Sequence, residues 1–175
     1  EEHYQRAQKI QEALEPGGLP MANTYINLGG LAFDRGNLRD AEMWARKGLA
    51  IYEALPGQEL TLAWAYNNLG NTALRRGDRD AGMAALLRAL EIYERQAPGS
   101  LYVAGTCANL GDLAQRQGNL DQAETWFKQA LEIREANAPA HVETAFSYIN
   151  LANLYHARKD VAGARIWLDK AVAKG

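Results

Sequence analysis

Asn68-Leu69-Gly70 is one of four closely similar tripeptides that follow one another at intervals of 41 residues. The others are Asn27-Leu28-Gly29, Asn109-Leu110-Gly111 and Asn150-Leu151-Ala152. Gly77 keeps the same interval with Gly36 and Gly118, and Lys159 stands at the fourth place. A fixed period over most of a chain is typical of repeat proteins, in which each period is one small structural unit.

Each period contains two amphipathic helices, as the second period illustrates. Leu62, Tyr66 and Leu69 recur at spacings of three and four residues, which places them on one face of a helix. Gly77 ends this helix, because glycine readily adopts the left-handed conformation found at helix C-termini. Asp78 follows and can accept hydrogen bonds from the free amides of the next helix, and Asn37, Asn119 and Asp160 occupy the same place. No stretch alternates with a period of two, so strands are not predicted.

These patterns predict a chain made only of helices. The predicted helices span residues 1–14, 20–35, 38–54, 60–76, 79–95, 101–117, 120–136, 142–158 and 161–174. Ile10 and Glu12 lie 41 residues before Ile51 and Glu53, so the chain is expected to begin inside the second helix of an earlier repeat. One solenoid domain is therefore predicted, with that helix in residues 1–19 and four repeats in residues 20–59, 60–100, 101–141 and 142–175.

The placement of small and aromatic residues in these helices resembles that of the tetratricopeptide repeat (TPR) family. The family has a Leu-Gly pair in its first helix, matched by Leu28-Gly29, Leu69-Gly70, Leu110-Gly111 and Leu151-Ala152. Its second helix has a small, an aromatic and a small residue, matched by Ala41, Ala123 and Ala164, then Phe127, then Ala89, Ala130 and Ala171. Departures from this pattern are Gly82, Ala45, Leu86 and Gly48.

The 41-residue period and the Asn-Leu-Gly core are most similar to the kinesin light chain subclass, which occurs also in bacterial multidomain proteins. The resemblance implies an all-α fold, an α-solenoid of about nine antiparallel helices wound into a right-handed superhelix. The first helix of each repeat would then line the concave face. HEAT and armadillo arrays have a similar period, but they lack the Leu-Gly pair and the spacing of small and aromatic residues.

Composition narrows the class of partner. The net charge of −2 gives no concentrated basic surface for nucleic acid or anionic lipid, and no apolar run approaches the roughly 20 residues of a membrane span. Cys107 is the single cysteine, which excludes an internal disulfide and fits a reducing compartment. We therefore expect a cytoplasmic protein that binds a protein or peptide partner and binds neither nucleic acid nor a membrane. The open ends of the array suggest a larger parent protein and end-to-end association of the isolated chain.

Catalytic chemistry is not predicted. His3, His141 and His156 lack the spacing of metal ligands. Cys107 occupies the position of Tyr25, Tyr66 and Tyr148 in the other repeats, so we interpret it as a small core residue rather than a nucleophile. Trp44, Trp126 and Trp167 share one position in the second helices, which favours packing. We expect no enzymatic activity, no metal site and no cofactor.

Four asparagines stand one residue before the core leucine and point away from it: Asn27, Asn68, Asn109 and Asn150. Asparagine is a mediocre residue inside a helix, because its side chain competes for backbone hydrogen bonds. Four asparagines in register therefore need an explanation. A primary amide both donates and accepts, so this series can hold the backbone of an extended peptide whatever its side chains are.

Further polar residues extend this strip. Three residues after the asparagines come Gly30, Asn71, Asp112 and Asn153. Arg75 and Arg116 stand near the ends of their helices and can pair with acidic groups. A similar asparagine ladder lines the peptide groove of kinesin light chain repeats, so the resemblance implies a peptide site at Asn27, Asn68, Asn71, Asn109, Asp112, Asn150, Asn153, Arg75 and Arg116. Trp64 and Phe146 can form side-chain pockets, although packing between repeats is the favoured interpretation.

Two alternatives stay open. In the first, repeat duplication copied the asparagine four times and the residue has no functional role, or the amides form hydrogen bonds with neighbouring backbone groups. The array can also be a structural or regulatory segment that spaces or restrains an attached effector domain. Some TPR proteins hold the C-terminal carboxylate of a chaperone with a clamp that has Lys directly before the asparagine. This clamp is not expected here, because the residues at that position are Ile26, Asn67, Ala108 and Ile149.

Overall fold

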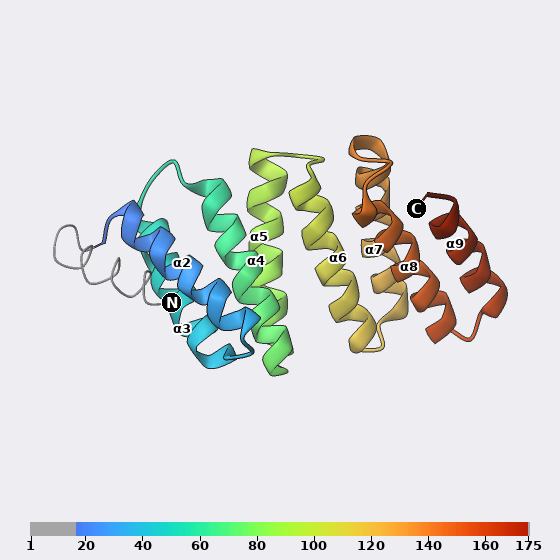
Figure 1. Cartoon of the computed structure of the whole chain (residues 1–175), viewed down its shortest axis with the longest axis horizontal. Coiled ribbons are helices and arrows are strands. Elements are labelled where there is room, and N and C mark those ends of the chain that lie inside the picture. The colour runs from blue at the N-terminus through green and yellow to red at the C-terminus, as the bar shows by residue number, and fades with distance from the viewer. Residues whose placement is uncertain (1–16, 175) are drawn as a thin grey trace. The chain divides into compact units, whose positions relative to one another are not determined.

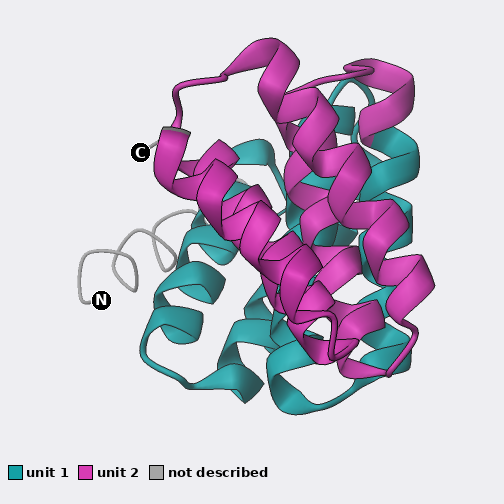
Figure 2. Cartoon of the chain, turned by 90° about the vertical axis from the view of Figure 1, so that its right-hand side faces the viewer, with its two compact units in different colours: residues 1–92 teal, residues 93–175 magenta. Residues whose placement is uncertain are grey.

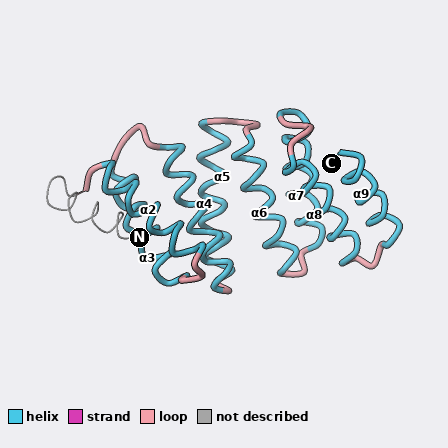
Figure 3. The backbone as a smooth tube through the Cα atoms, viewed as in Figure 1, coloured by secondary structure: helices cyan, strands magenta, loops and turns pink. Residues whose placement is uncertain are grey.

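The computed structural model describes residues 17–174, and these residues form eight helices and no strand (Figures 1 and 3). The helices are α2 (Leu19–Asp34), α3 (Leu38–Ala54), α4 (Glu59–Arg76), α5 (Arg79–Gln96), α6 (Leu101–Arg116), α7 (Leu120–Asn137), α8 (Val142–Ala157) and α9 (Val161–Lys174). Every predicted boundary within this range is correct to one residue. The predicted helix over residues 1–14 lies outside the described residues.

The chain divides into two compact units, Glu1–Ile92 and Tyr93–Gly175 (Figure 2). In the first unit α2 packs against α3, α3 packs against α4, and α2 also touches α4. In the second unit α6, α7, α8 and α9 pack in sequence, and α6 also touches α8. Within each unit, helices that start successive repeats are therefore neighbours.

Each unit has its own hydrophobic core. The core cluster of the first unit joins α2, α3 and α4 through Ala22, Ile26, Leu49, Tyr52 and Ala65. The core cluster of the second unit includes Phe127, Leu131, Tyr148, Leu151 and Leu154. Trp126 and Trp167 pack against that cluster, and the Trp44 ring stacks on Tyr25 with centroids 5.4 Å apart. The predicted packing role of these tryptophans is confirmed.

The glycine of the Leu-Gly pair allows the two helices of a repeat to approach closely. A Cβ added to Gly111 in α6 would lie 2.5 Å from Cε1 of Phe127 in α7. A Cβ added to Gly70 in α4 would lie 2.8 Å from Cγ of Leu86 in α5. Both distances are far shorter than van der Waals contact, so the sequence places glycine where another helix leaves no room for a methyl group.

The turns between paired helices repeat one capping arrangement. Gly36, Gly77 and Gly118 have positive φ angles of 76°, 86° and 81°, and Lys159 adopts the same conformation with φ 63°. The next residue then closes the helix by donating its N–H to a carbonyl five residues earlier, as Asp160 does to Tyr155 at 2.9 Å.

The predicted N-caps are confirmed at three of the four turns. The side chains of Asn37, Asp78 and Asp160 accept hydrogen bonds from backbone amides three residues ahead, at 3.4, 3.1 and 2.8 Å. Asn119 is the exception, because its side chain makes no capping bond. Its amide nitrogen instead donates to Oε1 of Gln117 at 3.4 Å.

The carboxylate of Glu124 in α7 interacts with three polar groups, one on its own helix, one on α8 and one on the residue that follows α8. Its carboxylate accepts from Lys128 at 2.7 Å and from the Tyr155 hydroxyl at 2.8 Å, and it pairs with Arg158. The hydrogen bond from Lys128 is the largest cause that lowers the Glu124 pKa to about 2, with Tyr155 and Arg158 adding to it and burial opposing it. This carboxylate is one polar link between α7 and the C-terminal end of α8.

Gly111→Ala and Gly105→Ala in α6 should change the free energy of unfolding in opposite directions. Both gain helix propensity, worth about 0.5–1 kcal/mol, and a Cβ at Gly105 would meet nothing within 4 Å. At Gly111 the clash with the buried Phe127 ring should outweigh that gain, since overpacking costs about 1–3 kcal/mol. Urea denaturation of the two variants measures this difference. A Gly111→Ala protein as stable as Gly105→Ala would contradict the close approach of α6 and α7.

Lys159→Gly should stabilise the chain by about 0.5–1 kcal/mol. A side chain in the left-handed region costs about 1–2 kcal/mol, and glycine removes that strain at a small entropic cost. Gly118→Lys is the matched variant in the preceding repeat, and it should destabilise by a similar amount. Thermal unfolding of both proteins shows whether each variant is more or less stable than the parent. A lower melting temperature for Lys159→Gly would contradict the prediction.

Glu124→Gln should lower stability at neutral pH but not near pH 2. Because the folded-state pKa lies below the ordinary value of 4.5, the carboxylate contributes stability above pH 4.5 and loses it as pH falls toward 2. The stability gap between the parent and the variant should therefore close over that window. Glu132→Gln, at an exposed position of the same helix, is the control for removing one carboxylate. A gap that stayed constant down to pH 2 would argue against the network.

Candidate functional site

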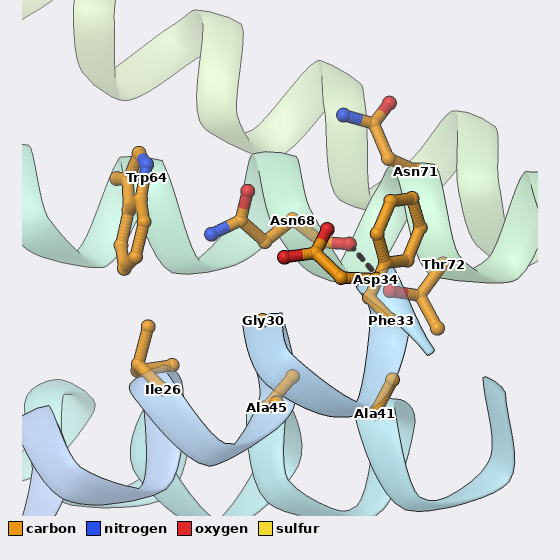
Figure 4. A pocket seen from close by; sticks show the side chains of 11 residues that line it. Ile26, Gly30, Phe33, Asp34, Ala41, Ala45, Trp64, Asn68, Asn71 and Thr72 are labelled. Atoms are coloured by element: carbon orange, nitrogen blue, oxygen red, sulfur yellow. Dashed lines mark hydrogen bonds between the residues drawn. The ribbon is translucent and has the colours of Figure 1, made fainter. Parts of the chain in front are cut away.

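A pocket with a volume of about 280 Å³ opens between α2 and α4 in the first unit (Figure 4). Its α2 wall consists of Ile26, Gly29, Gly30, Phe33 and Asp34. Its α4 wall consists of Trp64, Asn68, Asn71 and Thr72. Ala41 and Ala45 of α3 form the remaining part of the lining. The pocket therefore lies between the first helices of two successive repeats.

Helix geometry explains why these α4 side chains share one wall. Trp64, Asn68 and Asn71 follow one another at spacings of four and three residues, so they lie on the same face of the helix. In Figure 4, Asn68 lies between Trp64 toward one end of the pocket and Phe33 toward the other. Two aromatic rings thus flank a polar centre.

The two amides of this polar centre are available to a ligand. Asn68 and Asn71 are half-buried, and neither side-chain amide hydrogen-bonds to any part of the chain that the structure describes. The backbone carbonyl of Asn68 accepts a hydrogen bond from the Thr72 hydroxyl at 2.8 Å, which leaves the side-chain amide uninvolved. Each free amide offers two donors and one acceptor, which is the complement of a peptide backbone.

The space between the amides and α2 exists because residue 30 is glycine. A Cβ at Gly30 would meet nothing within 4 Å. Gly30 is therefore not required for helix packing, unlike Gly29, whose added Cβ would lie 3.2 Å from the Ala41 carbonyl oxygen. The other first helices carry a polar side chain at the Gly30 position, namely Asn71, Asp112 and Asn153.

Arg75 is less free than the sequence suggests. Its guanidinium lies 4.4 Å from the centroid of the Phe33 ring, and Nη1 donates to the Phe33 carbonyl at 3.4 Å. The side chain therefore covers one side of Phe33 rather than standing alone as an anion-binding group. Asp34 is exposed and supplies a carboxylate to the pocket.

The remaining predicted residues lie outside this pocket. Asn27 is exposed on α2 and does not line it. In the second unit Asn109 and Asn150 are half-buried, while Asn153 is exposed. Asp112 and Arg116 pair with each other on α6, with Nε donating to Oδ2 at 2.7 Å. Of the predicted set, the structure thus brings Asn68 and Asn71 together in one pocket.

Two aromatic residues are more exposed than the sequence-based interpretation predicts. Trp64 and Phe146, expected to pack between repeats, remain 41% and 54% exposed. Trp64 lines the pocket, together with Phe33 and Asp34, which sequence reasoning missed. Their spacing could have identified Phe33 and Asp34, because they follow Gly30 by three and four residues and therefore lie on the same face of the helix.

The described residues also locate the groups considered for catalysis. Cys107 is fully buried, and burial is the main cause that raises the pKa of its thiol to about 12, so the thiol stays protonated at neutral pH. No group of three or more potential metal-binding side chains occurs within residues 17–174. His141 accepts the Glu143 amide at the start of α8, and His3 lies outside the described residues. None of the described helices is both long and apolar enough to cross a membrane.

Comparison with known proteins identifies one family. The tetratricopeptide repeat model matches residues 1–54, 20–95, 61–136 and 102–173 in overlapping segments. No curated protein matches the chain. BtubC (BKLC) from P. vanneervenii has a similar structure, with 24% identity and a TM-score of 0.87 over 98% of this chain and 70% of that one.

Two further solved structures are similar. The apo form of RapI gives 15% identity and a TM-score of 0.88 over 97% of this chain and 61% of that one. A putative kinesin light chain of Podosopora anserina with nearly identical TPR-like repeats gives 16% identity and a TM-score of 0.84, covering 99% and 84%. All three likenesses fall below 25% identity, so they support the fold.

Proposed function

This chain belongs to the tetratricopeptide repeat family, and we propose that it is a protein–protein interaction module that holds an extended segment of a partner between α2 and α4. One observation carries the proposal: the half-buried amides of Asn68 and Asn71 make no hydrogen bond within the described residues and face a pocket with aromatic walls. A polar centre without partners is costly unless a ligand or water satisfies it.

The pocket has room for one side chain of a bound peptide. Its volume of about 280 Å³ lies just below the roughly 300–1,000 Å³ of typical small-molecule sites. One apolar side chain of a bound segment would lie between Trp64 and Phe33, while its backbone exchanges hydrogen bonds with the two amides. Main-chain hydrogen bonds then supply affinity, and the side-chain pocket supplies selectivity.

Charge adds a second element of selectivity. Asp34 lies at the pocket and is exposed, whereas the neighbouring Arg75 is engaged with Phe33. A segment with a basic residue next to its apolar anchor would therefore place a cation beside Asp34. An ion pair at such an exposed position contributes little affinity, about 0.2–1 kcal/mol, so the anchor and the amides would dominate binding.

Asn68→Ala/Asn71→Ala should weaken capture of a selected peptide by about tenfold or more, because each lost hydrogen bond is worth about 0.5–1.5 kcal/mol. Peptide display on the purified chain supplies the ligand, and fluorescence polarisation measures its affinity. Gly30→Leu should also weaken binding, because the new side chain fills the pocket without a clash at Cβ.

Asn27→Ala is the matched control, since Asn27 has the same repeat position but lies outside the pocket. It should leave affinity unchanged, and circular dichroism should show equal helicity in all variants. A selected peptide that bound the double variant as tightly as the parent would rule out this site. Failure to enrich any peptide on the folded chain would instead favour a spacer or restraint within a larger protein.

A further inference from the structure

A second pocket in the first unit lies between α3, α4 and α5, and its volume is about 380 Å³. The apolar part of its lining consists of Tyr66, Leu69 and Ala73 of α4 and of three alanines of α5, among them Ala85. This α3–α4–α5 pocket shares no lining residue with the pocket between α2 and α4. It is therefore a separate site, and its α5 wall is built of small side chains.

The repeat register shows which side chain is missing from this pocket. The residues that occupy the position of Ala85 in the other three repeats are all tryptophans: Trp44, Trp126 and Trp167. The Trp44 ring stacks on Tyr25 with centroids 5.4 Å apart, and the Trp167 ring lies 6.2 Å from that of Tyr148. Tyr25 and Tyr148 occupy the position of Tyr66. The second repeat thus keeps the tyrosine and lacks the indole that packs on it.

The Tyr66 ring is held in place as its counterpart in the fourth repeat is. The Tyr66 hydroxyl donates a hydrogen bond to the carboxylate of Glu53. In the same way, the Tyr148 hydroxyl donates to Glu135, which stands at the position of Glu53. A ring fixed at its hydroxyl end presents a defined face to the pocket, so a second ring can stack on it without further ordering.

A core leucine is partly uncovered in the same place. Leu69 belongs to the Leu-Gly pair of its repeat, and its counterparts Leu28, Leu110 and Leu151 are 5%, 0% and 0% exposed. Leu69 itself lines the pocket and is only half-buried. Removing apolar surface from water is favourable, so an apolar occupant of the pocket would complete this part of the core.

The pocket also keeps the cation that accompanies the tryptophan elsewhere. Nζ of Lys47 lies 4.7 Å from the centroid of the Trp44 ring, and Nζ of Lys170 lies 4.3 Å from that of Trp167. Arg88 stands at the same repeat position and lines the pocket. Its Nη1 pairs with Glu91 at 2.6 Å, and an arginine can stack the face of its guanidinium on a ring while an edge is paired.

From these contacts we infer that the α3–α4–α5 pocket binds a small planar aromatic molecule of about the size of indole. The ring would take the place of the missing tryptophan, stacked on Tyr66 and covered by the guanidinium of Arg88. The volume of about 380 Å³ lies within the roughly 300–1,000 Å³ of typical small-molecule sites. This inference does not depend on the function proposed for the α2–α4 pocket.

The distribution of apolar surface favours a small molecule over a protein segment as the occupant. Ala73 and Ala85 are buried inside the pocket, whereas the exposed residues of the lining are Arg46, Ala84 and Arg88. A stable protein interface extends over about 1,200–2,000 Å² and surrounds its anchor with further apolar contacts. This rim offers mainly charged groups, so the pocket suits a ring that is enclosed by the pocket alone.

Titration of fluoroindole with the purified chain, followed by fluorine NMR, tests this site. The parent should shift and broaden the probe signal, and Ala85→Trp should abolish binding, because its own indole would occupy the pocket. Tyr66→Leu should weaken binding about threefold or more, the usual contribution of one aromatic pair. Arg88→Gln should weaken it about two- to fivefold, as expected for an exposed cation–π contact.

Lys47→Gln is the matched control for Arg88→Gln, because Trp44 already occupies the equivalent place beside Lys47. It should leave the affinity for fluoroindole unchanged. Tyr66→Leu and Arg88→Gln keep the test decisive if Ala85→Trp does not fold. The inference is overturned if the parent does not bind fluoroindole, or if the folded pocket variants bind it as tightly as the parent.

Competition against fluoroindole tests the chemistry and the source of the ring. Unlabelled indole should displace the probe, whereas cyclohexylmethanol, which has an aliphatic ring, should not. Equal displacement by cyclohexylmethanol would overturn the inference, since any apolar group would then suffice. N-acetyltryptophanamide carries the same ring on a peptide backbone and should compete no better than indole. If it competes at a lower concentration than indole, a tryptophan side chain of a protein is the occupant and the small-molecule inference is wrong.

Discussion

The close approach of paired helices is the constraint on which the rest of the structure depends. Gly70 and Gly111 allow it, because a methyl group at either position would collide with Leu86 or Phe127 of the partner helix. Once each pair is fixed, its first helix presents a defined face to the first helix of the next repeat within the same unit, as α2 does to α4 and α6 does to α8. The pocket between α2 and α4 follows from that placement, as does the polar link at Glu124 between α7 and α8.

The sequence predicted the helices well because their signals are local. Most of the described helices have a Gly, Pro, Asn or Asp beside one end, whose conformational preference acts within a few residues, and the 41-residue period repeats those signals. The candidate site was only partly predictable. Asn68 and Asn71 stood out as unusual helix-interior residues, but Phe33 and Asp34 become site residues only once α2 and α4 are known to touch. Arg75 was predicted to be available to a ligand, because no neighbouring residue in the sequence indicates that its side chain covers Phe33.

The pocket between α2 and α4 arises at a departure from the repeat pattern. Gly30 lines the pocket at a position where the other repeats have a polar side chain. A Cβ at Gly30 would meet nothing within 4 Å, so helix packing does not require glycine there. The repeated positions maintain the scaffold, and we propose that positions such as Gly30, which break the repeat, select the partner.

The structure of the chain bound to a display-selected peptide tests the account most directly. We predict an apolar peptide side chain between the Trp64 and Phe33 rings, and peptide backbone groups within hydrogen-bonding distance of the Asn68 and Asn71 amides. A peptide bound elsewhere on the first unit, or on the second unit alone, with the α2–α4 pocket empty, would contradict the account.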